Sequence, residues 1–402
     1  MTSTQSEQSA KPLRVAMIGY AFMGAAHSLA WRTAPRQFDL PLDPQMRVLC
    51  GRNATAAAEA AERLGWAETA TDWRDVVARD DIDLVDICTP GDSHAEIAIA
   101  ALEAGKHVLC EKPLANSVAE AEQMTEAARK AAARGVRSSV GFSYRRVPAL
   151  ALARQLVADG KLGRVHHVRA LYLQDWIVDP DFPLAWRLQK DKAGSGALGD
   201  LGAHIIDLAE FVTGDRLTGV SAATETFIRQ RPLLESSSGL AGTGDSGGRM
   251  GEVTVDDAAV FFGRTSGGAL ATFEATRFAT GRKNAMRIEV NGSAGSLAFD
   301  FEYMNELHVY DGTVPAVEAG FRRILVTEPE HPYLSGWWPA GHGLGYEHTF
   351  THEVVDLVRD IAADRDPSPS FADGLAVQRV LAAVEQSAAE ESRWTPVDFS
   401  AR

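Results

Sequence analysis

Short runs of β-forming residues alternate with helical stretches over the first third of the chain, from Leu13 to about Phe142. The runs are apolar and short, and the stretches between them are rich in alanine. This alternation is typical of a parallel sheet whose strands are joined by crossover helices. We therefore predict parallel strands at Leu13–Ile18, Met46–Cys50, Asp83–Cys88, His107–Cys110 and Val136–Gly141.

Two of the intervening helices have start signals. Ser93 precedes Glu96 by three residues, and Ser117 precedes Glu120 by the same spacing. This spacing is that of a capping box, in which the serine hydroxyl accepts from the third helical amide. We expect a helix to begin at each serine and to end at the glycine that follows it, Gly105 or Gly135.

The pattern changes after about residue 150, where strand-like runs follow one another with few helices between them. Successive strands favour an antiparallel sheet. The chain has 402 residues, more than the ~250 to 300 at which a single core stops growing. We therefore predict an α/β protein with a disordered tail over 1–11, a Rossmann dinucleotide-binding domain over 12–145, and an α+β domain with a large, mostly antiparallel, open-faced sheet over 146–402.

The predicted strands of this second domain are Arg164–Gln174, Gly219–Ile228, Asp256–Phe262, Ala269–Thr276, Met286–Val290 and Ser296–Phe299. An exposed apolar sheet face favours burial against another subunit. We therefore expect a homodimer or a homotetramer in which this domain also binds the substrate.

Charge and composition exclude several classes of partner. Forty Lys and Arg against 54 Asp and Glu give a net charge of −14, which repels nucleic acid and anionic membranes. No apolar run approaches the ~18 to 20 residues of a membrane span, and the polar first eleven residues do not resemble a signal peptide. Three cysteines without a disulfide spacing fit a reducing compartment. We expect a soluble cytoplasmic protein that binds neither nucleic acid nor membranes.

A glycine-containing turn follows the first predicted strand and leads into a helix. At such a turn the free amides of the helix can hold a pyrophosphate. The usual second glycine is an alanine here, so an ordinary tight turn is the alternative. We expect a dinucleotide to contact Gly19, Ala21, Phe22, Met23 and Gly24.

The end of the second strand bears on the choice of cofactor. A carboxylate at this place binds the ribose hydroxyls of NAD, whereas an arginine accommodates the extra phosphate of NADP. The sequence there contains Arg52 and no acid, and a guanidinium suits phosphate. We therefore favour NADP over NAD, the alternative being that Arg52 is only a solvated surface residue.

Two segments carry side chains suited to proton transfer. Lys112 precedes a proline at the end of a strand, where ligands of open α/β sheets bind. Asp200, His204 and Asp207 are spaced four and three residues apart, which would place them on one helical face. A capped, solvated helix start with Asp200 as the cap is the alternative for this second segment.

These motifs occur together, and in this order they resemble the Gfo/Idh/MocA family (glucose-fructose oxidoreductase / inositol dehydrogenase). The resemblance extends over nearly the whole chain and rests on the glycine turn, Cys88-Thr89-Pro90 with His94, Glu111-Lys112-Pro113, Trp186-Arg187 and the helix that contains Asp200, His204 and Asp207. Within the family, Phe142–Arg146, Leu173–Trp176, Glu274–Arg277 and Gly343–Tyr346 are most similar to the levoglucosan dehydrogenase-like sugar dehydrogenases.

The resemblance implies that Lys112, Asp200 and His204 are catalytic. Removing a hydride from a secondary alcohol requires a base that also takes the hydroxyl proton, a role suited to His204. An ammonium beside the same oxygen stabilises the developing alkoxide and lowers the imidazole pKa, and Asp200 orients substrate or imidazole. The resemblance also implies that the cofactor, NAD(P), is bordered by Thr89, Pro90, His94, Glu111 and Lys112, with Glu111 holding Lys112.

A sugar needs polar groups around an apolar face. We expect the substrate to contact Tyr144, Arg145, Asp175, Trp176 and Trp186 together with Lys112, Asp200 and His204. The two tryptophans could equally be core residues. No basic cluster suited to a phosphate stands out in this half, so an uncharged sugar or polyol is favoured over a sugar phosphate.

Three histidines near the C-terminus are candidate metal ligands. His348 and His352 are one helical turn apart and His342 is close, but the glutamate of a zinc protease helix is missing between the pair and no cysteine is near. We predict no metal, and we expect His342 and His348 to line the sugar pocket or its rim.

The sequence thus predicts an NAD(P)-dependent dehydrogenase that reversibly oxidises a ring secondary hydroxyl of a sugar, anhydrosugar or inositol to a ketone. One alternative is a redox-neutral, NAD-dependent enzyme that cleaves glycosides. Another is a dinucleotide-binding sensor or partner protein without turnover.

Overall fold

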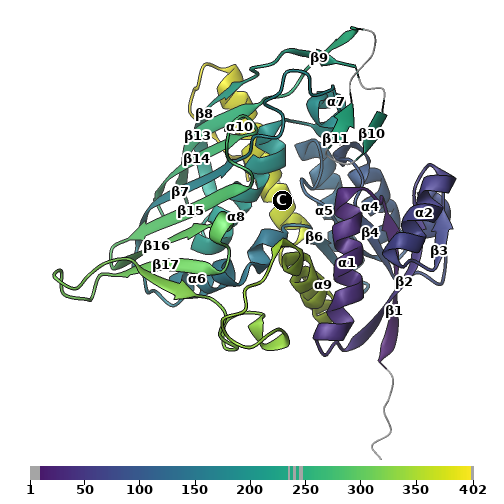
Figure 1. Ribbon diagram of the computed structural model, residues 1–402, viewed down its shortest axis with the longest axis horizontal. Helices are drawn as coiled ribbons and strands as arrows, with labels where there is room; N and C mark the ends of the chain where they lie inside the picture. Colours follow the sequence, from purple (N-terminus) through teal and green to yellow (C-terminus); the bar gives the residue numbers. More distant parts are fainter. Residues whose placement is uncertain (1–9, 234–235, 239–240, 244–247, 400–402) are drawn as a thin grey trace, which may run out of the picture.

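The structure, a computed structural model, describes residues 10–233, 236–238, 241–243 and 248–399. Most of the tail predicted over 1–11 lies outside the described residues, and the first strand already begins at Lys11. The chain forms two sheets, and helices lie between and around them (Figure 1). Among the helices described, none combines the length and hydrophobicity needed to cross a bilayer.

The N-terminal sheet has six parallel strands in the order β3-β2-β1-β4-β5-β6, which confirms the predicted Rossmann arrangement. Its strands are β1 (Lys11–Ile18), β2 (Leu42–Cys50), β3 (Glu68–Ala70), β4 (Leu84–Ile87), β5 (His107–Cys110) and β6 (Ser138–Val140). Its helices are α1 (Phe22–Gln37), α2 (Ala54–Leu64), α3 (Trp73–Val77), α4 (His94–Glu103) and α5 (Val118–Ala132). The short edge strand β3 was not predicted.

Only one of the two predicted capping boxes forms a side-chain cap. The Ser117 hydroxyl accepts from the amide of Glu120 at 3.2 Å. The Ser93 hydroxyl instead donates to Thr89 Oγ1 and to the carbonyl of Pro90. The 3₁₀ turn Gly91–Ser93 precedes α4 and places Ser93 near helical torsion angles, so its side chain points back along the chain. The predicted helix ends are confirmed, because Gly105 and Gly135 both have positive φ.

The second sheet has nine strands in the order β18-β17-β16-β15-β7-β14-β13-β8-β19, and all neighbours are antiparallel except β7 and β14. This confirms the predicted large, mostly antiparallel sheet. Its strands are β7 (Val165–Leu173), β8 (Leu217–Glu225), β13 (Ala258–Thr265), β14 (Leu270–Thr276), β15 (Ala285–Gly292), β16 (Gly295–Asp300), β17 (Glu306–Asp311), β18 (Arg322–Leu325) and β19 (Thr395–Pro396). Two small strand pairs are β9 (Gln230–Pro232) with β12 (Met250–Glu252), and β10 (Ser236–Ser238) with β11 (Ala241–Thr243).

The nine-stranded sheet is covered by helices on one face. Figure 1 shows α6 (Pro148–Ala158), α8 (Ala203–Thr213) and α10 (Phe371–Ala389) on the side that faces the N-terminal domain. In the described part of the chain no element covers the opposite face. Apolar side chains are exposed there, with Val260 at 55%, Phe262 at 46% and Leu270 at 36%.

The C-terminal part of the chain returns to the first domain. Helix α9 (Tyr346–Ala362) packs along α1 (Figure 1), and its Phe350, Val354 and Val358 share a buried core with Trp31 of α1. Our predicted boundary at residues 145 and 146 therefore separates the two sheets along the sequence, whereas the packing of the first domain includes this later helix.

Candidate active site

A cavity of about 830 Å³ opens between the two sheets, at the carboxyl ends of β1, β4 and β5. This is the edge at which open parallel sheets bind their ligands. All the predicted cofactor residues except the two turn glycines line it: Ala21, Phe22, Met23, Arg52, Thr89, Pro90, His94, Glu111 and Lys112. Of the predicted substrate residues, Tyr144, Trp176, Trp186, Asp200 and His204 also line it.

The turn between β1 and α1 packs too closely against neighbouring backbone to admit a side chain at either glycine. Gly19 has a φ of 99°, and a Cβ there would lie 2.7 Å from the carbonyl of Cys88. A Cβ on Gly24 would lie 2.3 Å from the carbonyl of Gly19. Ala21 caps α1 without a side-chain hydrogen bond, and no acidic residue lies in the first turn. The free amides at this helix start therefore fit a pyrophosphate.

The segment after β4 forms another wall of the cavity. His94 is buried, with Nδ1 3.0 Å from the carbonyl of Pro113 and Nε2 2.9 Å from the carbonyl of Thr89. These contacts tie the segment after β4 to the segment after β5. Thr89 and Pro90 are thereby held at the cavity wall.

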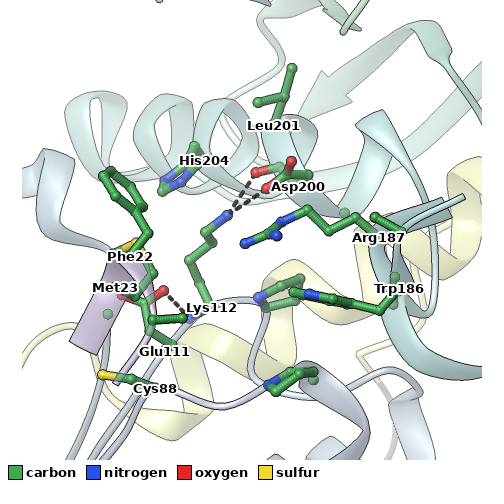
Figure 2. A pocket seen from close by; sticks show the side chains of 18 of the residues that line it. Phe22, Met23, Cys88, Glu111, Lys112, Trp186, Arg187, Asp200, Leu201 and His204 are labelled. Atoms are coloured by element: carbon green, nitrogen blue, oxygen red, sulfur yellow. Dashed lines mark hydrogen bonds and ion pairs between the residues drawn. The ribbon is translucent and has the colours of Figure 1, made fainter. Parts of the chain in front are cut away.

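Lys112 and Asp200 come from different domains and meet in this cavity (Figure 2). The Lys112 Nζ donates to the carbonyl oxygen of Asp200 at 2.8 Å and to its Oδ1 at 3.2 Å. Asp200 lies in a π-helical turn, Leu198–Gly202, directly before α8. The turn brings both acceptor groups of Asp200 to the ammonium, so Asp200 is not the simple solvated cap that was the alternative.

The Asp200 carboxylate is surrounded by cations. Burial opposes its ionisation, but Lys112, Arg277 and Arg187 together hold the pKa of Asp200 well below its ordinary value. The Arg277 guanidinium lies 3.9 Å from Oδ2. Asp200 is therefore an anion at neutral pH, with its side chain 30% exposed toward the cavity.

His204 lies one turn further along, beside Lys112 in Figure 2. Burial, and then the nearby ammonium of Lys112, lower the pKa of His204 well below its ordinary value, although Asp200 acts in the opposite direction. Its Nδ1 is buried without a hydrogen-bond partner among the described residues. A neutral imidazole at a cavity wall can accept a proton from a ligand.

A hydrogen-bonded row of side chains continues the cavity beyond His204. Tyr144 packs against the His204 ring, with centroids 4.6 Å apart, and its hydroxyl lies 2.7 Å from that of Tyr172. The Tyr172 hydroxyl donates to Asn284 Oδ1 at 2.6 Å, and Gln174 Nε2 donates to the same oxygen at 2.8 Å. Burial raises the pKa of Tyr144 to about 12. The row offers neutral donors and acceptors, which suit hydroxyl groups better than phosphate.

Several lining residues were missed by the sequence analysis. They are Tyr172, Gln174, Arg187, Arg277, Lys283, Asn284, Tyr346 and Phe350. Gln174, Arg277 and Tyr346 lie in the stretches quoted for the family branch, and Arg187 follows the predicted Trp186, so these four had a signal. Asn284 had none, because nothing near it in sequence indicates that it ends up beside Gln174.

Two predicted substrate residues lie outside the cavity lining. Arg145 is buried and forms an ion pair with Asp207, and both its Nε and Nη2 donate to that carboxylate. This pair also explains why Asp207 does not join Asp200 and His204 at the cavity. Asp175 accepts from Lys283 Nζ at 2.8 Å and from the amide of Gly281. The prediction that Arg145 and Asp175 contact the sugar therefore has no support in this geometry.

The three C-terminal histidines do not meet around a common point. His342 Nδ1 lies 2.7 Å from the carbonyl of Pro339, His348 accepts from the Gly345 amide at the start of α9, and His352 accepts from Trp337 Nε1. None of the three is among the residues that line the cavity, so the expectation that His342 and His348 line it has no support, while a place at its rim stays a prediction.

One group of three metal-ligating side chains lies close together among the described residues. The donor atoms of His27, Asp86 and Cys88 lie within 4.8 Å of one another. They are hydrogen-bonded among themselves, and burial and Asp86 raise the pKa of the Cys88 thiol, which therefore stays protonated. These contacts describe a hydrogen-bonded cluster. The prediction of no metal remains a prediction.

Comparisons with known proteins identify the family. Residues 13–142 match the oxidoreductase family with an NAD-binding Rossmann fold, and residues 150–298 match the GFO/IDH/MocA C-terminal domain. Levoglucosan dehydrogenase of Pseudarthrobacter phenanthrenivorans is 44% identical over 96% of this chain and 98% of its own. A crystal structure of an oxidoreductase domain protein from Kribbella flavida is 67% identical, with a TM-score of 0.92 over 96% of this chain and 100% of that chain. Levoglucosan dehydrogenase in complex with NADH is 42% identical, with a TM-score of 0.90 over 96% and 100%.

Fold and site together define an NAD-binding oxidoreductase. The chain belongs to the Gfo/Idh/MocA family, as its motifs predicted, and both family domains are present in the expected order.

Proposed function

We propose that this protein is an NAD(P)-dependent dehydrogenase that reversibly oxidises a ring secondary hydroxyl of a sugar, anhydrosugar or inositol to a ketone. One observation carries the proposal. The ammonium of Lys112 lies 2.8 Å from the carbonyl and 3.2 Å from the carboxylate of Asp200, in a cavity that is also lined by His204 and by Ala21 of the turn after β1. Arg52, Thr89 and the turn after β1 would hold NAD(P), which would supply the hydride acceptor for the carbinol carbon.

The protein's own side chains account for the proton. Neutral His204 takes the proton of the reacting hydroxyl, while the Lys112 ammonium stabilises the developing charge on the same oxygen. Asp200 stays ionised and holds Lys112 through two contacts. Phe22 and Tyr346 stack with ring centroids 6.3 Å apart and cover the same cavity, so they help to exclude water.

The neutral polar row supports a neutral substrate. Tyr172, Gln174 and Asn284 present hydroxyl and amide groups to the cavity, and Trp176 donates to Gln174 Oε1 at 3.0 Å. An indole face beside such groups is suited to a sugar ring. The relative named levoglucosan dehydrogenase points to the same substrate class, and an anhydrosugar is the first compound to test.

The test is a screen of anhydrosugars, sugars and inositols with NAD+ and NADP+, in which the absorbance of reduced nicotinamide is followed. We expect reduced cofactor and ketone to form in equal amounts. Product without net reduced cofactor would favour the redox-neutral, glycoside-cleaving enzyme. Binding of NADPH without turnover on any compound would favour the sensor.

The finer choice of cofactor rests on Arg52, which lines the cavity just after β2 in a stretch, Gly51–Asn53, that contains no acidic residue. We infer a preference for NADP. Because a hydrogen bond to a charged group contributes ~1.5–3 kcal/mol, Arg52→Ala should lower kcat/KM for NADP+ by roughly 10- to 100-fold. The value for NAD+ should change by less than about 3-fold, since no phosphate contact is lost. Arg63→Ala, an exposed arginine on the helix α2 that follows, is the control. Equal values for both cofactors in the unmodified protein would contradict the inference.

The exposed sheet face supports a homo-oligomer. Val260 and Phe262 alternate along β13 with buried residues, so the exposed apolar side chains gather on one face. We expect light scattering to give a dimer or a tetramer and Phe262→Lys to shift the protein to a smaller species, because a buried charge there lacks a partner. Tyr303→Lys, an exposed residue outside the sheet, should leave the mass unchanged. A monomeric unmodified protein would refute the expectation.

A further inference from the structure

A histidine of α1 lies beneath the cavity and takes no part in the chemistry above. His27 is 1% exposed. Its Nδ1 lies 3.0 Å from both carboxylate oxygens of Asp86, and its Nε2 lies 3.0 Å from Oε1 of Glu111. The histidine therefore joins two buried carboxylates, one on β4 and the other directly after β5.

Glu111 connects this histidine to the proposed catalytic lysine. Its Oε2 accepts the backbone amide of Lys112 at 3.0 Å, as the dashed line beside Glu111 in Figure 2 shows. A Cβ on Gly141 would lie 3.1 Å from Oε1, so the carboxylate is closely packed from the other side. Both oxygens of Glu111 thus have a partner within the protein, which fixes the orientation of the carboxylate.

We propose that His27 is a positioning residue: by joining Asp86 and Glu111 it fixes the Glu111 carboxylate, which holds the Lys112 backbone so that the ammonium reaches Asp200. The proposal rests on the proposed function, because it assigns His27 to the placement of the lysine that acts there. His27 itself is not among the residues that line the cavity, but it contacts the lining residue Glu111.

The charges around His27 are consistent with this role. Burial opposes protonation, but Asp86 raises the pKa of His27 well above its ordinary value. An imidazolium donates from both nitrogens, as two flanking carboxylates require. Trp31 Nε1 donates to Asp86 at 2.7 Å, and the Cys88 thiol also donates to it.

The other titratable groups near His27 are Glu353 and Tyr346 on α9 and Cys110 at the end of β5. Burial raises the pKa of Glu353 to about 8, while His27 and Arg146 oppose this shift. Glu353 is therefore mostly neutral at pH 7 and does not compete with Glu111 for the histidine. The ring of Phe350 packs against His27, with centroids 5.4 Å apart, and closes the cluster on this side.

The test replaces His27 with a neutral side chain of similar length. In His27→Gln we expect Lys112 to shift and kcat/KM to fall on the order of 100-fold, as a small misplacement of a reacting group does. We also expect the acid limb of the kcat/KM profile to move to higher pH. The reason is that the Lys112 ammonium lowers the pKa of His204, and its withdrawal removes this effect. The other groups around His204, namely Asp200, Tyr144, Tyr172 and Phe142, are unchanged.

A matched control is available at another buried histidine. His352 is fully buried, accepts from Trp337 Nε1 and lies 2.9 Å from the carbonyl of Arg146, away from Lys112. His352→Gln should lower stability but leave the pH profile in place. If both variants lose activity in proportion to stability, with unchanged profiles, the role of His27 is only structural and the proposal fails.

Two further measurements show whether the activity lost in His27→Gln results from a misplaced Lys112 or from reduced stability. Removing His27 leaves two carboxylates in a buried place, so a second variant, His27→Gln with Asp86→Asn, restores the charge balance. It should regain stability without regaining the pH profile, and full recovery of activity would refute the proposal. A crystal structure of His27→Gln tests placement without turnover: Lys112 Nζ should leave hydrogen-bonding distance of Asp200. Because this measurement does not depend on turnover, it tests the role of His27 even if the protein oxidises no sugar and the proposed function is wrong.

Discussion

Replacing His204 with alanine should lower kcat/KM for sugar oxidation by roughly 10²- to 10⁴-fold, the contribution typical of a positioned general base. The hydroxyl proton would then have to leave to water in a cavity that Tyr144 and Phe142 help to close around His204. Cofactor affinity should change little, because His204 lies on α8 and the glycine turn lies on the other domain. Steady-state kinetics and a separate titration with reduced cofactor measure the two effects.

His342→Ala is the control for this experiment, since His342 is exposed and lies outside the cavity. Partial rescue of His204→Ala by added imidazole would support the role of a base. If the variant keeps near-normal turnover while it remains folded, another group takes the proton and the assignment of His204 is wrong.

Replacing Lys112 with methionine should lower kcat by about 10²- to 10³-fold, because one donor to a developing oxyanion is lost. It also changes the pH dependence in a defined direction. His204 is active as a base in its neutral form, so activity falls as the pH drops through the pKa of His204. Lys112 lowers this pKa and Asp200 raises it. Without the lysine the acid limb should therefore move to higher pH, which a pH profile of kcat/KM measures.

Lys190→Met provides the matched control, because Lys190 is exposed and pairs with Glu385 at 3.1 Å, away from the cavity. It should leave both the rate and the profile unchanged. An acid limb that stays in place in Lys112→Met would show that the ammonium does not act on His204, even if the rate falls.

Much of the fold could be predicted because local pattern and packing agree. The apolar runs ending at Ile18, Cys50 and Cys110 end as strands at those residues. The three-residue strand β3 and the strands β17 and β18 were missed because they are short or bear exposed charge, as at Arg322. Their pairing depends on neighbours distant in sequence, which no local pattern reveals.

The site, like the fold, could be predicted only in part. Lys112, Asp200 and His204 were recognised together only through the family resemblance, since no spacing along the chain links residues that lie 88 apart. Arg145 was misplaced for the opposite reason. Its guanidinium was expected to supply a polar contact to a sugar, whereas it is buried and pairs with Asp207. Sequence patterns indicate which side chains are capable of chemistry, but not which of them are neutralised inside the protein.

The packing of α9 against α1 has a consequence for engineering. An experimenter who recombines two relatives to transfer coenzyme preference would naturally cut near residue 145, between the sheets. Such a chimaera would place Trp31 of one parent against Phe350 and Val358 of the other. A recombinant that keeps this packing must therefore take two separate segments from the same parent: the N-terminal domain and Tyr346–Ala362.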